Sequence, residues 1–234
     1  MIQAILVIGK PGCGKSIMVW YLGALLDEDG YSISYLSDRL MLEEGVLADT
    51  QRSRRLADGS KIGKHSKLIA DGPPGHRKVH VLDGNILNNV HRFMIQSIKK
   101  NNPERTTIME YAIGPDIDFG HDKEPLLQST KHFVGWLQEF RLIKRVFIID
   151  VESPLAIREA RQYARPDAMA IETFRAYFPD GGEMTKADKT KLGNHYYQFR
   201  NLEEDNDAFF SEARYLYESR IAPELFRKIR VVGR

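Results

Sequence analysis

The sequence has little cysteine, little net charge and no long apolar run. One of its 234 residues is cysteine, which excludes an intramolecular disulfide framework. Lys and Arg total 34 against 32 Asp and Glu, and a formal charge of +2 gives no electrostatic case for a nucleic-acid or membrane partner. The apolar runs reach about six residues, far short of the ~20 that a membrane-spanning helix needs.

Length and composition indicate the expected class of protein. A chain of this length can bury a substantial core, and we expect a single α/β domain over residues 1–234. The sequence starts with an apolar, strand-like run and not with the pattern of a signal peptide, so we expect a reducing, cytoplasmic location. The hypotheses for assembly are a monomer and a homodimer.

The stretch from Gly9 to Ser16 is the most informative part of the chain. It reads Gly-Lys-Pro-Gly-Cys-Gly-Lys-Ser and fits the phosphate-loop pattern G-x-x-x-x-G-K-S/T, between an apolar run and a helical pattern. Glycines let successive N–H groups turn into one concavity that a β- or γ-phosphate can fill, at the positive end of the helix dipole. We therefore predict that Lys15 reaches the phosphates and that the Ser16 hydroxyl ligates Mg²⁺.

The predicted nucleotide-binding residues of this loop are Gly9, Lys10, Pro11, Gly12, Cys13, Gly14, Lys15, Ser16 and Ile17. Cys13 has two interpretations. It is either a small residue that fits the loop, or a thiol whose pKa is lowered by the helix N-terminus and which is therefore oxidisable.

Apolar and β-branched runs predict parallel strands, because such strands are covered on both faces. The runs fall at 2–8, 31–36, 106–109, 146–149 and 195–199, with a short end strand at 231–232. Helical spacing predicts helices at 15–29, 40–56, 85–100, 126–142 and 205–225, and another helix after Asp150. Strands and helices thus alternate, which predicts an α/β fold with a parallel sheet.

Residues 40–83 depart from this alternation. Residues 67–83 predict a hairpin around Gly72-Pro73-Pro74-Gly75, within an insertion on the substrate side of the sheet. Residues 51–55 contain three arginines, which we interpret as a solvated helix face. Four histidines, His65, His76, His80 and His91, fall in or near the hairpin, but their spacing matches no known zinc site.

Polar and charged residues follow the predicted strands, where open α/β sheets place their ligands. Glu110 follows the third strand, and a carboxylate beside the phosphate loop would hold the water shell of Mg²⁺; Asp83 and Asp150 compete for this role. Asp38 follows the second strand. It is predicted either as the base that faces the acceptor hydroxyl or as the N-cap of the next helix.

A group of arginines follows the fourth strand. The helix predicted after Asp150 holds Arg158, Arg161 and Arg165, and the first two share a helical face because they lie three residues apart. Residues 166–192 lack sustained periodicity and contain Pro179-Asp180-Gly181-Gly182. We predict that residues 158–192 form a flexible lid that brings these arginines to the transferring phosphoryl group.

The order of these features resembles the P-loop nucleoside and nucleotide kinases, a family that includes adenylate kinase, deoxynucleoside kinase and shikimate kinase. The resemblance implies a three-layer α/β fold with a five-stranded parallel sheet in the order 2-3-1-4-5, which places the Glu110 strand beside the phosphate-loop strand. It also implies that Arg200 and Asn201 pack against adenine. Deoxynucleoside kinases have Glu-Arg where this sequence has Glu110-Tyr111.

Two hypotheses follow. In the first, the protein is an ATP-dependent phosphotransferase that moves the γ-phosphoryl of Mg-ATP to a small-molecule acceptor, a nucleoside or nucleotide. The predicted parts, which are a phosphate loop, Mg²⁺ ligands, arginines and a base, are those that phosphoryl transfer needs. In the second, it is a P-loop NTPase or an ATP-binding regulatory protein that changes conformation for a protein partner.

Overall fold

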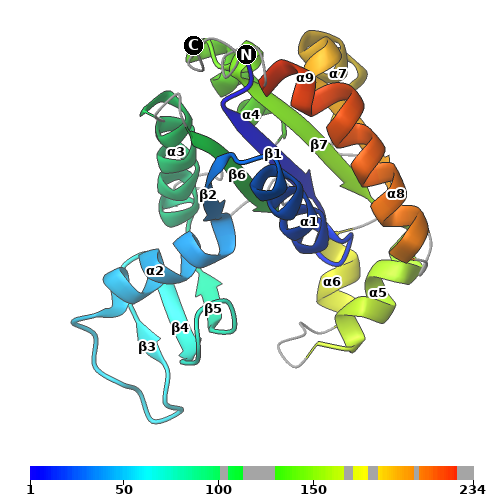
Figure 1. Ribbon diagram of the computed structural model, residues 1–234. Coiled ribbons are helices and arrows are strands. Elements are labelled where there is room, and N and C mark those ends of the chain that lie inside the picture. The colour runs from blue at the N-terminus through cyan, green and yellow to red at the C-terminus, as the bar shows by residue number, and fades with distance from the viewer. Residues whose placement is uncertain (101–104, 113–129, 166–170, 179–183, 203–205, 226–234) are drawn as a thin grey trace.

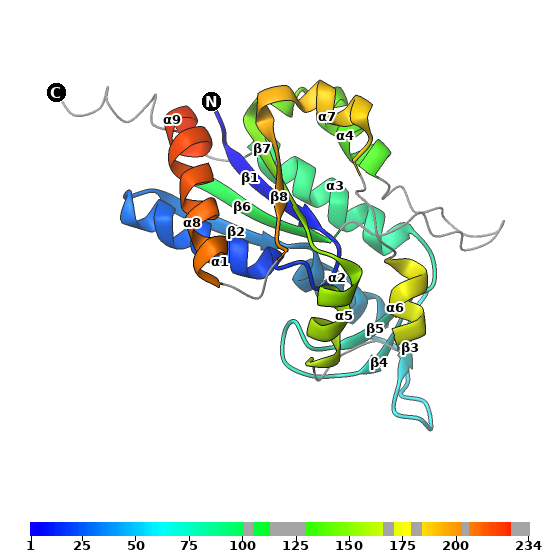
Figure 2. The same ribbon diagram turned by 90° about the vertical axis from the view of Figure 1, so that its right-hand side faces the viewer.

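The computed structural model describes residues 1–100, 105–112, 130–165, 171–178, 184–202 and 206–225. Five parallel strands form its central sheet: β1 (Ala4–Gly9), β2 (Ser32–Ser37), β6 (Arg105–Ala112), β7 (Val146–Glu152) and β8 (Tyr196–Arg200). They lie in the order β2-β6-β1-β7-β8 (Figures 1 and 2). This is the predicted order 2-3-1-4-5, so the predicted α/β fold with a five-stranded parallel sheet is confirmed.

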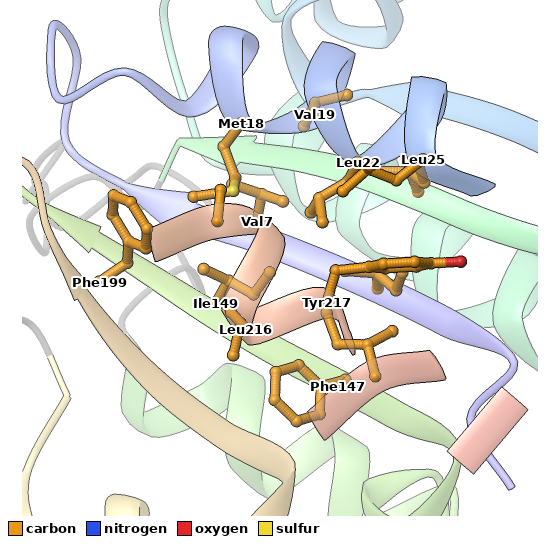
Figure 3. Packing of buried hydrophobic residues seen from close by; sticks show 14 of the residues in the cluster. Val7, Met18, Val19, Leu22, Leu25, Phe147, Ile149, Phe199, Leu216 and Tyr217 are labelled. Carbon is orange, nitrogen blue, oxygen red and sulfur yellow. The ribbon is translucent and has the colours of Figure 1, made fainter. Parts of the chain in front are cut away.

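Helices cover both faces of this sheet. On one face lie α1 (Lys15–Glu28), α8 (Asn206–Leu216), a π-helical turn (Tyr217–Ile221) and α9 (Ala222–Leu225). Met18 and Leu22 of α1 and Leu216 pack there with Val7 and Ile149 (Figure 3). The sheet is therefore the middle of three layers, and all six residues of β1 are buried because this strand is central and covered on both faces.

The opposite face packs against α3 (Asn85–Lys100) and α4 (Thr130–Glu139). Leu6 and Ile148, one residue before Val7 and Ile149, belong to this second cluster because successive strand residues point to opposite faces. The alternation gives each face its own hydrophobic core.

Several predicted bounds are confirmed and others shift. Helix α3 spans the predicted residues, and the predicted helix at 205–225 corresponds to α8, the π-helical turn and α9. Helix α4 ends three residues before the predicted bound and is followed by a 3₁₀ turn, Ile143–Arg145. Strand β6 is longer than predicted, so Glu110 lies within it and not after its end. The strand predicted at 231–232 lies outside the described residues.

The insertion consists of α2 (Asp38–Thr50) and a separate antiparallel sheet of β3 (Lys61–Ile62), β4 (Ser66–Ala70) and β5 (Lys78–Val81). The predicted hairpin is confirmed as β4 and β5, whereas β3 was not predicted. Val46 of α2, Leu68 of β4 and Ile86 of α3 form a small core between them. Because α2 ends at Thr50, residues 51–55 lie in a loop, and their interpretation as a helix face is wrong.

Between residues 155 and 192, the described part of the chain forms three short helices, α5 (Leu155–Tyr163), α6 (Ile171–Tyr177) and α7 (Lys186–Leu192). The last two fall in the segment without periodicity, because seven residues are too few to show it. The predicted turn at 179–182 lies outside the described residues, and closure of this segment as a lid stays a prediction. No helix in the described ranges is long and apolar enough to cross a membrane.

Candidate functional site

The phosphate loop joins β1 to α1 through glycines in conformations that other residues rarely adopt. Gly12 has φ 79° and Gly14 has φ 103°. A Cβ atom at Gly12 would lie 2.9 Å from the carbonyl oxygen of Arg158, and one at Gly14 would lie 2.5 Å from Asn201 Nδ2. Glycine is therefore required at both positions by the backbone angle and by the close approach of neighbouring elements.

Lys15 is held against this loop. Its side chain is buried, and Nζ donates a hydrogen bond of 3.1 Å to the carbonyl of Lys10. Lys15 is also the first residue of α1, where the helix dipole places positive charge. The ammonium group and the helix N-terminus thus combine at one place, as an anion-binding loop needs.

Ser16 and Glu110, both predicted as Mg²⁺ ligands, meet in the structure. Ser16 Oγ donates a hydrogen bond of 2.6 Å to Glu110 Oε1, across 94 positions of the sequence. Tyr35 on β2 donates to the other oxygen, Oε2, at 2.7 Å. Burial and the neighbouring carboxylate raise the pKa of Tyr35, so its hydroxyl stays protonated as a donor. Sequence reasoning missed Tyr35.

The competing carboxylates lie elsewhere. Glu110 is in register with Val7, whose side chain faces α1, whereas Asp150 is in register with Ile8, which faces the opposite layer. Asp150 accepts a hydrogen bond of 2.8 Å from Tyr196, and burial raises the pKa of Asp150 to about 6. Strand geometry therefore separates Asp150 from Ser16.

Asp83 has a structural role at the start of α3. It accepts hydrogen bonds from the backbone N–H of Asn85 at 2.9 Å, and its other oxygen lies 2.7 Å from His65 Nδ1. No group of three or more His, Cys, Asp or Glu side chains in the described ranges could hold a metal ion. Mg²⁺ needs fewer protein ligands, because it keeps several waters and binds phosphate oxygens, so Ser16 and Glu110 fit this ion.

Asp38 is the first residue of α2, directly after β2. The N-cap of α2 is Ser37, not Asp38, and Ser37 is in register with Glu110. The N-cap interpretation of Asp38 is therefore wrong. The structure places this half-buried carboxylate one residue beyond the position that pairs with Glu110, at the carboxyl edge of the sheet.

A buried glutamate connects α2 to the β4–β5 turn. Glu43 is fully buried and accepts hydrogen bonds from Arg39 Nε at 2.7 Å and from the N–H of Gly75 at 2.8 Å. Arg77 Nη1 lies 3.5 Å from the same carboxylate, and Arg39 Nη2 donates to the carbonyl of Arg77. Sequence reasoning missed this cluster; the one available signal was the i, i+4 spacing of Arg39 and Glu43.

The three predicted lid arginines have different surroundings. Arg161 Nη1 donates to the carbonyl of Gly12 at 3.1 Å, so it contacts the phosphate loop. Arg158 is buried and donates to the carbonyls of Ser153 and Phe178, both at 2.9 Å, which joins α5 to the end of α6. Arg165 lies beyond the end of α5 and is exposed, so its predicted place in that helix is wrong. Arg161 thus bonds to the loop through its side chain, whereas Arg158 lies against Gly12 through its backbone.

Asn201 also contacts the loop. Its Nδ2 donates to the carbonyl of Cys13 at 2.8 Å, and its backbone N–H donates to the carbonyl of Glu152 at 2.7 Å. The side chain is buried, whereas Arg200 at the end of β8 is exposed. The sequence predicted adenine contact for both residues, but the Asn201 amide is used to brace the loop.

Cys13 lies inside the loop and is buried. Burial raises the pKa of its thiol, which outweighs the opposite effect of Lys15. This supports the interpretation of Cys13 as a small residue that fits the loop and contradicts the interpretation as an oxidisable thiol of low pKa.

Comparison with known proteins finds similarity of fold and no similarity of sequence that would indicate a function. No protein-family model and no curated protein matches the sequence. The solved structure of a protein described as APE1195 superposes with a TM-score of 0.51 at 12% identity, covering 95% of this chain and 97% of that one. An identity this low shows similarity of fold and nothing about activity.

Two further solved structures are more distant. A sugar kinase from Janibacter sp. HTCC2649 has a TM-score of 0.42 at 12% identity, covering 96% of this chain and 98% of its own. Shikimate kinase from Acinetobacter baumannii, in complex with shikimate, has a TM-score of 0.46 at 11% identity, with coverage of 93% and 92%. Scores at this level add nothing to the assignment of function.

Proposed function

We propose that this protein is an ATP-dependent phosphotransferase that moves the γ-phosphoryl of Mg-ATP to a hydroxyl group of a small-molecule acceptor, a nucleoside or nucleotide. The observation that supports this best is the hydrogen bond of 2.6 Å between Ser16 and Glu110 beside the buried Lys15. A hydroxyl, a carboxylate and an ammonium group are the side chains that hold Mg²⁺ and a triphosphate in P-loop enzymes.

In this proposal, the N–H groups of residues 9–16 and the ammonium of Lys15 hold the β- and γ-phosphates. Ser16 and Glu110 would hold Mg²⁺, directly or through its waters, with Tyr35 orienting the Glu110 carboxylate. When bound there, Mg²⁺ would neutralise negative charge on the phosphate oxygens.

Asp38 is proposed as the base that accepts the proton of the acceptor hydroxyl. It lies at the same edge of the sheet as Glu110, since it directly follows the residue that pairs with Glu110. The insertion begins at this residue, so an acceptor held between the insertion and the phosphate loop would have its hydroxyl close to Asp38.

The arginines divide between two roles in this proposal. Arg161 would contact the equatorial oxygens of the transferring phosphoryl, because its guanidinium already lies 3.1 Å from the Gly12 carbonyl. Arg165 would approach the phosphates on lid closure. Arg158 is proposed as a positioning residue that fixes α5, and Arg200 as the residue that contacts adenine, with Asn201 supporting the loop.

A transfer assay tests this function. The protein is incubated with [γ-³²P]ATP, Mg²⁺ and a panel of nucleosides, nucleoside monophosphates and small hydroxylated metabolites, and labelled products are separated. A labelled acceptor that is lost with Lys15→Ala is the expected result. ATP binding without any product would instead favour a regulatory protein, and release of phosphate that no acceptor alters would favour a hydrolysing NTPase.

A further inference from the structure

The insertion has a charge that the composition of the whole chain conceals. Residues 51–80 contain eight Lys and Arg but two Asp, a net charge of +6, so the other 204 residues together carry −4. The net charge of +2 for the chain is therefore the sum of a strongly basic segment and an acidic remainder. Such segregation creates a local positive field that an average cannot show.

Most of these cations are not neutralised within the protein. Lys67 lies 3.3 Å from Asp58, and Arg77 contacts Glu43 and Asp71. Five others are exposed and, within the described ranges, form no ion pair: Arg52, Arg54, Arg55, Lys64 and Lys78. Their charge is available to an anionic partner.

The small sheet distributes the cations over both of its faces. Leu68 and Val79 pack toward α2, which leaves the other face to Ile62, Lys67 and His80, aligned across the three strands. Arg55 pairs with Lys61 as a fourth backbone segment beside β3. Because Lys61 is in register with Leu68, Arg55 and Lys61 lie on the face toward α2. The exposed cations of both faces and of the adjoining loops are together called the basic surface.

The loop that carries the arginines is fastened to the sheet. Ser53 Oγ donates a hydrogen bond of 2.6 Å to the carbonyl of Ile62. The N–H of Leu56 donates a hydrogen bond of 2.8 Å to the carbonyl of Ser60. Arg52, Arg54 and Arg55 therefore project from a fixed backbone. Cations held in this way lose less entropy on binding than cations of a mobile tail.

The basic surface is too long for a small anion. Its near end is the turn at Arg77, whose carbonyl accepts a hydrogen bond from Arg39, next to Asp38. Its far end is the loop after α2, a helix of 13 residues and so roughly 20 Å long. A ligand that neutralises the whole surface must be a polyanion of comparable length.

We propose that residues 51–80 bind the phosphodiester backbone of a nucleic-acid duplex, through the five exposed cations. Residues 51–84 contain no Phe, Tyr or Trp. Single-strand binding depends on aromatic stacking platforms, so it is disfavoured here. Lys and Arg suffice for contacts to a duplex backbone. The proposal is independent of the phosphotransferase activity.

Fluorescence anisotropy with a labelled 24-base-pair RNA duplex tests the proposal. We expect micromolar binding at 50 mM KCl and, for about five phosphate contacts, a roughly 500-fold weaker affinity at 200 mM KCl. The triple variant Arg52→Glu, Arg54→Glu, Arg55→Glu should lose at least about tenfold in affinity, and the salt slope should fall by about three. Because the contacts are to phosphates, a scrambled duplex should bind equally.

A matched variant controls for net charge. Arg92→Glu, Lys100→Glu, Lys144→Glu changes the charge by the same amount at exposed positions outside the insertion, and it should leave affinity within about twofold. Should the first variant fail to fold, the milder Lys64→Gln, Lys78→Gln variant should still reduce the salt slope by about two. Circular dichroism establishes folding of each variant.

Three results would overturn the proposal: no duplex binding at 50 mM KCl, equal losses in the two triple variants, or equally tight binding to vesicles containing phosphatidylserine. ATP binding, measured by calorimetry on the Arg52, Arg54, Arg55 variant, should match the wild type. Failure of duplex binding with intact ATP binding would therefore refute this proposal alone and leave the phosphotransferase proposal standing.

Discussion

Replacement of Glu110 by glutamine tests the Mg²⁺ site most directly. The substitution keeps the size of the side chain and an oxygen that can accept from Ser16, but it removes the negative charge. Hydrogen bonds to charged groups contribute ~1.5–3 kcal/mol, whereas neutral ones contribute ~0.5–1.5 kcal/mol. The binding free energy of a Mg²⁺ ion held by the Glu110 oxygens should fall by at least this difference when the carboxylate is replaced by the neutral amide.

The difference, about 1–1.5 kcal/mol, corresponds to roughly a tenfold weaker affinity for Mg-ATP. Isothermal titration calorimetry with ATP at several Mg²⁺ concentrations measures it, and ATP binding in the presence of EDTA should be unchanged. The matched control is Asp150→Asn, the same chemical change on the other strand next to β1, on the opposite face of the sheet. The Mg²⁺ dependence of this control should equal that of the wild type.

Equal Mg²⁺ dependence in Glu110→Gln and the wild type would refute the assignment of Glu110. If only Asp150→Asn lost the Mg²⁺ dependence of ATP binding, Asp150 on the other face of the sheet would be the metal ligand. Tyr35→Phe separates charge from orientation, because it removes the donor to Oε2 while the carboxylate remains. We expect this variant to lose less affinity than Glu110→Gln.

Three further predictions concern individual residues. Lys15→Ala should weaken ATP binding in calorimetry by ~1.5–3 kcal/mol, because a charge-assisted contact to phosphate is lost. Asp38→Asn should leave ATP affinity intact but reduce turnover in the transfer assay by about 10²–10⁴-fold, the contribution of a positioned base. Burial raises the pKa of Asp150 to about 6. The contribution of this carboxyl group to folding stability is therefore fully present below its unfolded pKa of ~3.9 and is lost as pH rises through 6. Asp150→Asn should therefore stabilise the protein at pH 8, by roughly 2 kcal/mol in urea unfolding, and change little at pH 4.

The sheet could be predicted because its strands are strongly apolar and alternate with periodic helices. The meeting of Ser16 and Glu110 could also be predicted, since both were placed at the carboxyl edge of neighbouring strands. Strand β3 was missed because two residues carry no pattern. The lid segment was predicted as irregular for a similar reason, as α6 and α7 have seven residues each.

The charged residues were harder to place. Arg158 and Arg161 were correctly put on the same helix, but Arg is almost always exposed, so nothing in the sequence indicated that Arg158 is buried. Glu43 is a similar case, because its burial depends on Gly75 and Arg77, which lie 32 and 34 positions away in the sequence. Side-chain pairing across such separations is decided by tertiary packing and not by local pattern.

The brace from Asn201 makes the assembly of the phosphate loop a late event in biosynthesis. The hydrogen bond from Asn201 to Cys13 spans 188 positions, so the loop leaves the ribosome long before the amide that supports it. Since the Asn201 backbone also bonds to Glu152 at the end of β7, the support exists only once β8 has docked beside β7. A nascent chain that stops before residue 201 would carry the whole sequence of the phosphate loop without the side chain that braces it. The loop would thus reach its braced shape only when β8 has been made and paired with β7.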